Sequence, residues 1–102
     1  MHPIEDKAEV SIDFPDKFYM GKFEQESFYE ARAEGDGLAF RLVREGEEKR
    51  AVSVHLHHYV LAGILSDWAA SLRDAEPVDR AHAKELTDAL KAVEKALARR
   101  RK

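Results

Sequence analysis

The stretch AVSVHLHHYV, residues 51–60, contains the point at which the chain changes from one periodicity to another. Before it, Val52, Val54 and Leu56 alternate with small or polar residues, which is typical of a half-buried strand. After it, the apolar residues recur with the period of a helix, at Leu61, Ile64, Leu65, Trp68 and Leu72. The junction therefore predicts a strand that ends near residue 56 and a helix that begins at about residue 58.

The residues before this junction predict an antiparallel meander. Strand-like segments occupy residues 8–14, 17–23, 27–34, 38–43 and 50–56. The motif GDG at 35–37 indicates a tight hairpin, because glycine adopts positive φ without steric cost. The polar stretch 45–49 forms a second turn, whereas Gly21 makes the segment 17–23 ambiguous. We expect four or five strands within about 8–56, with one apolar face.

The residues after the junction predict two helices. The first, about 58–73, ends before Pro77, and Asp79 is suited to cap a second helix at about 79–99. The apolar stripe of the second helix comprises Leu86, Leu90, Val93 and Leu97. The basic stretch RRRK, 99–102, forms a tail. The fold class is thus α+β, a single domain over 1–102 with both helices packed on one face of the sheet.

The apolar face of the sheet and the apolar sides of the helices should pack together to form the core. The apolar sheet residues Val10, Ile12, Phe40, Leu42, Val52 and Val54 should face the helical residues Leu61, Leu65 and Trp68. An open-edged sheet and two apolar helix stripes present more apolar surface than one small sheet covers. We therefore expect a homodimer.

The composition is that of a globular protein without disulfides. Of the 102 residues, 44% are hydrophobic and 36% charged, and there is no cysteine. The first residues, MHPIEDKAEV, are acidic where a signal peptide would be basic and then apolar. These features predict a cytoplasmic protein with no membrane contact. The net charge of −3 also argues against a dedicated binder of duplex DNA.

Three histidines at the junction raise the question of a metal. On a strand, His55 and His57 project from the same face, whereas His58 begins the helix. A metal site needs three or four converging ligands, and the sequence does not place an acid such as Glu9 or Asp13 beside the pair. We predict that the histidines are structural and that no metal or cofactor binds. Metal binding by His55 and His57, or titration as a pH switch, are the alternatives.

No motif in the sequence predicts catalysis. The GDG motif lies between two strands and does not precede a helix, as a phosphate loop would. The chain has neither a cysteine nucleophile nor an H-E-x-x-H zinc motif. We therefore expect a protein that is not an enzyme and has no catalytic residues.

One segment carries a family resemblance. KRAVSVHLHHYVLAGILSDWAASL, residues 49–72, is a charged turn and a short strand that runs directly into a helix. Together with the preceding meander, over residues 27–72, it resembles single-strand nucleic-acid binders of the positive-cofactor-four, Whirly and purine-element types. The resemblance implies a homodimer with helices on one face of the sheet and nucleic acid on the other. It assigns Arg32, Arg41 and Ser53 to the nucleic-acid face.

Three functional hypotheses follow. The most specific is a homodimer that binds single-stranded nucleic acid, with phosphate contacts and stacking from Arg32, Arg41, Arg44, Lys49, Arg50, Ser53 and Phe28. The second is a domain for protein–protein interaction or assembly that binds no nucleic acid. The third is a small metal protein built on the histidines.

Overall fold

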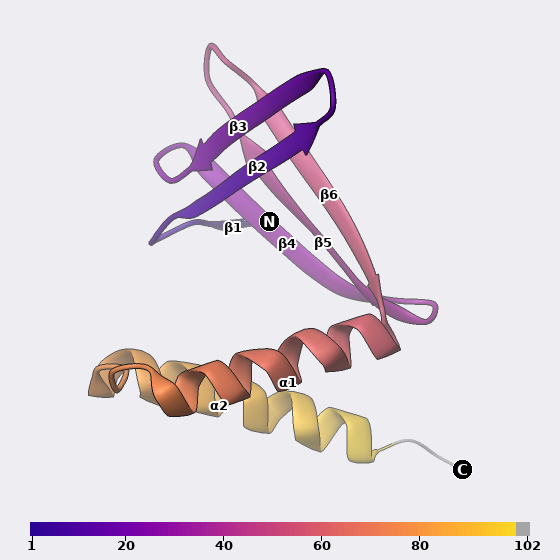
Figure 1. Ribbon diagram of the computed structural model, residues 1–102, viewed down its shortest axis with the longest axis vertical. Helices are drawn as coiled ribbons and strands as arrows, with labels where there is room; N and C mark the ends of the chain where they lie inside the picture. Colours follow the sequence, from indigo (N-terminus) through magenta and orange to yellow (C-terminus); the bar gives the residue numbers. More distant parts are fainter. Residues whose placement is uncertain (100–102) are drawn as a thin grey trace. The chain divides into compact units, whose positions relative to one another are not determined.

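The computed structural model describes residues 1–99, which form six strands followed by two helices (Figure 1). The strands are β1 (His2–Pro3), β2 (Ala8–Phe14), β3 (Lys17–Phe23), β4 (Ser27–Glu34), β5 (Gly37–Arg44) and β6 (Arg50–His57). The helices are α1 (His58–Asp74) and α2 (Arg80–Ala98). The predicted α+β class is confirmed. The described strands number six and not four or five, and they form two sheets.

The strands pair mostly with their neighbours in the sequence. One sheet has the order β1-β4-β5-β6, and β2 and β3 form a separate hairpin. Every pair is antiparallel. The strands β4, β5 and β6 form a meander, whereas β2 and β3, which were predicted to belong to it, pair only with each other. The strand β1 adds two residues to the edge of β4. That addition was not predicted, because two residues are too few to show a period.

The register of the meander separates an apolar face from a polar one. Leu42 of β5 lies between Tyr29 of β4 and Val52 of β6, and Phe40 pairs with Val54. Because paired residues point to the same side, these side chains share one face. The opposite face, which we call the outer face, carries Phe28, Glu30, Arg32, Glu34, Ala39, Arg41, Val43, Ala51, Ser53, His55 and His57.

The ambiguous segment 17–23 forms the regular strand β3. Its glycine, Gly21, lies so close to β6 that an added Cβ would come within 3.0 Å of Arg50 Nη1. Phe23, at the end of the strand, is 2% exposed. The hairpin and β6 thus line a groove, to which Val10, Ile12, Tyr19, Met20 and Val52 contribute.

The helix boundaries agree with the prediction to within one residue at each end. His58 follows the last residue of β6, so strand and helix are joined without a linker. Asp79 caps α2 as expected, since its carboxylate accepts a hydrogen bond from the backbone N–H of His82 at 3.2 Å. Arg99 is the C-cap residue of α2, and the remainder of the predicted tail lies outside the described residues.

The described chain divides into two compact units, residues 1–66 and the part from residue 67 onward. The first contains all the strands and the first half of α1, and the second contains the rest of α1 and α2. The single domain and the packing of the helices on the sheet stay predictions.

Both helices expose their apolar residues. We call Leu61, Leu65, Trp68 and Leu72 the α1 stripe, and Leu86, Leu90, Val93 and Leu97 the α2 stripe. No residue of either helix is buried. Trp68 is 38% exposed and Leu90 45%, whereas Phe23 is the one buried hydrophobic residue among those described. The apolar residues of both stripes are therefore exposed or half-buried, and none of them is fully buried.

Asp79 makes α2 sensitive to acid. The side chain and the backbone N–H of His82 donate to its carboxylate and hold the pKa of Asp79 below its ordinary value of 3.8. Because the pKa of Asp79 is lower in the folded protein than in the unfolded chain, its charged carboxylate stabilises α2 at pH values above 3.8. This stabilisation is lost as the pH falls through the folded-state pKa. We expect Asp79→Asn, whose amide oxygen still caps the helix, to lack this loss. The difference in melting temperature between the wild type and Asp79→Asn, followed by circular dichroism, should change in favour of the variant below pH 3.8. A difference that is constant with pH would contradict the role of the carboxylate.

Candidate functional site

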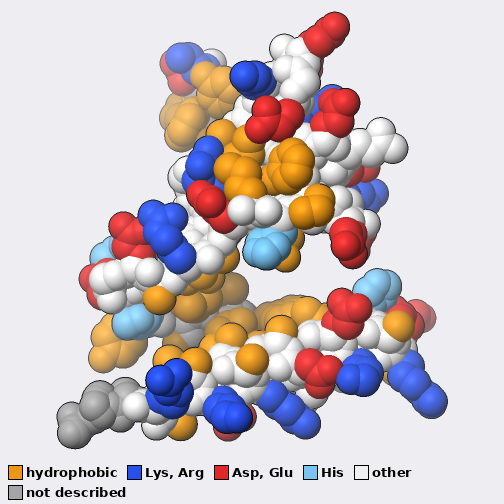
Figure 2. Space-filling model, turned by 180° about the vertical axis from the view of Figure 1, so that it is seen from behind, with side chains coloured by type: hydrophobic (Ala, Val, Ile, Leu, Met, Phe, Trp, Pro, Cys, Tyr) orange, Lys and Arg blue, Asp and Glu red, His pale blue; other side chains and the backbone are white. Residues whose placement is uncertain are grey.

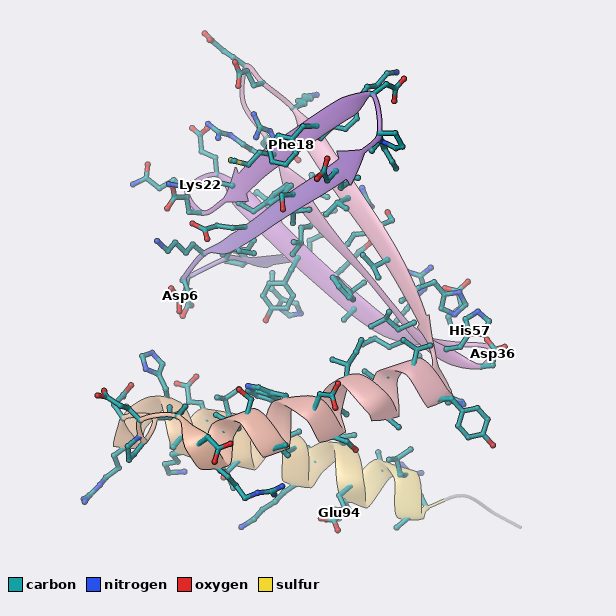
Figure 3. All side chains as sticks on the ribbon, in the orientation of Figure 1. Asp6, Phe18, Lys22, Asp36, His57 and Glu94 are labelled. Carbon is teal, nitrogen blue, oxygen red and sulfur yellow. The ribbon has the colours of Figure 1, made fainter. Side chains whose placement is uncertain are left out.

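The structure brings a carboxylate to the histidine pair. Asp36, in the turn between β4 and β5, lies beside His57 at the end of the sheet (Figure 3). His57 Nδ1 is 2.9 Å from Asp36 Oδ2, and His55 Nε2 is 3.7 Å from Asp36 Oδ1. The two imidazole rings are 4.7 Å apart between centroids. We call Asp36, His55 and His57 the His–Asp cluster.

The sheet register creates this cluster. In a three-stranded meander, the turn after the first strand lies beside the end of the third, and Gly37 accordingly pairs with His57. The backbone N–H of His58 donates to the carbonyl of Asp36 at 3.0 Å, which ties the turn to the start of α1. Backbone contacts of Asp36 itself and of Gly37 thus hold the turn against the end of β6 and the start of α1.

The two glycines of the GDG turn have different roles. Gly35 has a φ of +54°, as the hairpin prediction required. Gly37 is needed for space, because an added Cβ would lie 1.9 Å from the carbonyl oxygen of Leu56. The close approach of the turn to β6 is therefore possible only with glycine at position 37.

The cluster has the donor set of a metal site. One ligand atom from each of the three residues can be chosen so that all lie within 4.8 Å of one another. The three side chains are exposed, from 41% for His55 to 65% for Asp36. Glu9 and Asp13 were the acids named as possible third ligands from the sequence, whereas the third ligand that the fold supplies is Asp36. From the sequence, Asp36 was identified only as a turn residue of the GDG motif. His58 contributes its backbone to the turn and begins α1, as expected.

Four of the predicted nucleic-acid residues share the outer face. Arg41 of β5 pairs with Ser53 of β6, and Arg32 lies on the same side of β4. Both arginines contact acids: Arg41 Nη1 is 3.2 Å from Glu30 Oε2, and Arg32 Nη2 is 2.6 Å from Glu34 Oε1. Phe28 lies on this face as well. The positive charge of these arginines is therefore balanced by neighbouring carboxylates.

The other predicted cations lie elsewhere. Arg44 and Arg50 pair with each other on the apolar side of the sheet. The Nε atom of Arg44 is buried without a hydrogen-bond partner, and Arg50 lies 3.0 Å from Glu48 and against the hairpin at Gly21. Lys49 is exposed in the turn before β6. The predicted nucleic-acid residues thus do not form one surface.

The charge on the visible surface is mixed. Figure 2 shows acidic and basic side chains interspersed over the strands, with apolar side chains between them. This pattern gives no continuous basic track of the kind that follows a phosphate backbone. The outer face is accordingly a mixed-charge surface that ends in the His–Asp cluster.

No helix in residues 1–99 is both long and apolar enough to cross a membrane.

The sequence and fold have no recognisable counterpart among the proteins with which they were compared. The resemblance to single-strand nucleic-acid binders stays a prediction. The chain matches no protein-family model, and neither a curated protein nor a solved structure matches it significantly.

Proposed function

We propose that this protein is a small non-catalytic interaction domain that assembles as a homodimer through α1 and α2. The observation that carries the proposal is the exposure of the α2 stripe and of every residue of the α1 stripe except Leu61, which is half-buried. Trp68, Leu65 and Leu72 are each 38% exposed. The exposed members of the α2 stripe are Leu86, Leu90, Val93 and Leu97, at 41% to 68%. Contiguous apolar surface of this kind marks an interaction site in a stable protein.

The spacing of the stripes favours a second copy as the partner. The α1 stripe, at residues 61, 65, 68 and 72, and the α2 stripe, at residues 86, 90, 93 and 97, have the same four-three-four spacing. This is the heptad spacing by which helices interdigitate in coiled coils and four-helix bundles. Two copies supply four such helices, and a twofold axis makes the combined apolar surface complementary to itself. We therefore propose a dimeric four-helix bundle.

The composition of α1 supports the same partner. Between Tyr59 and Ser66 the helix has no charged residue, and Val60 and Ile64 widen the apolar side next to the stripe. A broad apolar arc fits a helix with more than one helical neighbour. In a bundle of four helices each helix has two neighbours, which α2 and a second copy together provide.

The nucleic-acid hypothesis is the alternative. The pairing of Arg32 with Glu34 and of Arg41 with Glu30 favours protein interaction over phosphate binding. Fluorescence anisotropy with a labelled single-stranded oligonucleotide at low salt distinguishes the two. Binding that is lost in Arg32→Ala with Arg41→Ala would support the alternative and would leave the dimer to be tested separately.

The dimer itself predicts a definite mass and a buried tryptophan. We expect light scattering to give twice the chain mass of 11.6 kDa, and the emission of Trp68 to move to longer wavelength on dilution as the dimer dissociates. Trp68 reports on the interface because it is the one tryptophan in the chain. A monomer at high micromolar concentration whose Trp68 emission is already at short wavelength would mean that the chain's own sheet covers the stripe. That result would overturn the proposal.

A further inference from the structure

The sequence predicted no bound metal because it placed no third ligand beside the histidine pair. Since the fold supplies Asp36 as that ligand, we propose that the His–Asp cluster is a binding site for one divalent transition-metal ion of the zinc class. The site consists of one oxygen of Asp36 and one ring nitrogen each from His55 and His57. It is independent of the helix stripes, which lie on other elements, and of the proposed dimer. The inference rests on the arrangement of the three side chains at the end of the meander.

The backbone holds these residues in a suitable arrangement. His55 and His57 are two residues apart on β6 and therefore project from one side of the sheet. Asp36 reaches them from the adjoining turn, whose backbone is fixed by the Gly37–His57 pair and by the His58 N–H. Ligands held on a strand ladder and a hydrogen-bonded turn lose little backbone freedom when an ion binds.

The distances allow an ion to bind after a small adjustment. Zinc lies about 2.0–2.2 Å from imidazole nitrogen and carboxylate oxygen, which places the ligand atoms of a tetrahedral site roughly 3.3 Å apart. The three ligand atoms of the cluster lie within 4.8 Å of one another. The approach that remains to be made is about 1.5 Å at most. Because all three side chains are exposed, rotation about their own bonds can close this distance without moving the sheet.

The two histidines lie at different distances from the carboxylate. His57 Nδ1 is 2.9 Å from Asp36 Oδ2. His55 Nε2 is 3.7 Å from Asp36 Oδ1, which is too far for a hydrogen bond. The two rings lie side by side, with 31° between their planes. An ion between the carboxylate and the two rings would give each of the three groups a bond.

The donor types select the class of ion. Imidazole nitrogen suits zinc, nickel, cobalt and iron(II), whereas magnesium and calcium prefer sites made entirely of oxygen. The chain has no cysteine to favour copper(I). Three protein ligands leave one position of a tetrahedral zinc ion for water. The expected site is therefore an open, exposed zinc site, weaker than a closed site with four protein ligands.

The experiment is a calorimetric titration of the full-length protein, prepared without a histidine tag, with zinc chloride. We expect one ion per chain, and no binding of magnesium or calcium under the same conditions. His55→Gln and His57→Gln should each weaken zinc binding at least about tenfold, since each removes one of three ligands. Cobalt(II) should give a visible absorption spectrum that either substitution abolishes.

The chain provides its own matched control. His82 contacts Asp79, so this pair offers one imidazole and one carboxylate without the second imidazole. His82→Gln should leave zinc binding unchanged. Zinc binding that is absent in the wild type, that survives both cluster substitutions, or that depends on His82 would overturn the proposal. A stoichiometry of one ion per two chains would overturn it as well.

The substitutions are chosen so that loss of folding does not imitate loss of the ligand. His55 makes no hydrogen bond to Asp36, so His55→Gln should keep the wild-type circular dichroism spectrum and melting temperature in the absence of metal. Zinc should raise the melting temperature of the wild type and of His82→Gln but not that of His55→Gln. If all three proteins are stabilised equally, the ion binds elsewhere and the proposal fails.

Discussion

Leu65→Glu should dissociate the dimer. Leu65 lies in the middle of the α1 stripe, and in a symmetric bundle the substitution places two carboxylates in the apolar interface. An unpaired charge in such a place costs several kcal/mol, so the two copies together should cost at least about 4 kcal/mol, which raises the dissociation constant roughly a thousandfold. Light scattering should then give the chain mass of 11.6 kDa at concentrations where the wild type gives twice that value.

Ser66→Glu is the matched control for this experiment. It adds the same charge to the same helix one residue further on, where the helical period carries the side chain away from the stripe. We expect it to remain a dimer, with the Trp68 emission of the wild type. If Leu65→Glu has the same dissociation constant as Ser66→Glu, the α1 stripe is not the interface and the bundle must be rejected.

Gly37→Ala should destabilise the sheet by about 3 kcal/mol or more. A methyl group at this position would lie 1.9 Å from the carbonyl oxygen of Leu56 and 2.9 Å from the Cα of His57, both of them backbone atoms. Backbone cannot rotate away as a side chain does, so β5 and β6 must separate, and overpacking of this kind is at the costly end of its usual range. Urea unfolding of the wild type and the variant, at equal protein concentration, measures the loss.

Gly63→Ala makes the same chemical change in the opposite structural setting. Apart from the neighbouring backbone of its own helix, a Cβ at Gly63 meets no atom within 4 Å, and the residue lies within α1 on the side away from the stripe. Alanine favours a helix over glycine by about 1 kcal/mol, so this variant should be slightly more stable than the wild type. Equal effects of the two substitutions would mean that the turn moves freely and that Gly37 is not fixed against β6.

Most of the element boundaries could be predicted because each has a local cause. The change of period between Leu56 and Leu61 locates the end of β6 and the start of α1, and Asp79 locates the start of α2 through its own side chain. The strand β1 has no such signal. It exists because the edge of β4 offers Phe28 and Tyr29 as partners, and that edge is a property of the folded sheet.

The candidate site was only partly predictable for the same reason. The shared face of His55 and His57 follows from the strand period, but the identity of the third residue depends on which turn lies beside the end of β6. In a meander of β4, β5 and β6, the turn between β4 and β5 lies beside the end of β6, and GDG is that turn. The predicted meander and the GDG motif, taken together, would therefore have placed Asp36 beside the histidines. The pairing of Arg41 with Glu30 depends on register in the same way.

The connectivity of the strands also bears on the order of events during synthesis. Among the described strands, only β1 pairs with a partner distant in the sequence; β2–β3, β4–β5 and β5–β6 are all hairpins of consecutive strands. Local pairing of this kind has a low entropic cost of closure and permits rapid folding. The sheet can therefore fold before α2 has left the ribosome. On the proposed assembly, the surfaces that associate are completed last, so a chain reaches its partner with its strands already paired.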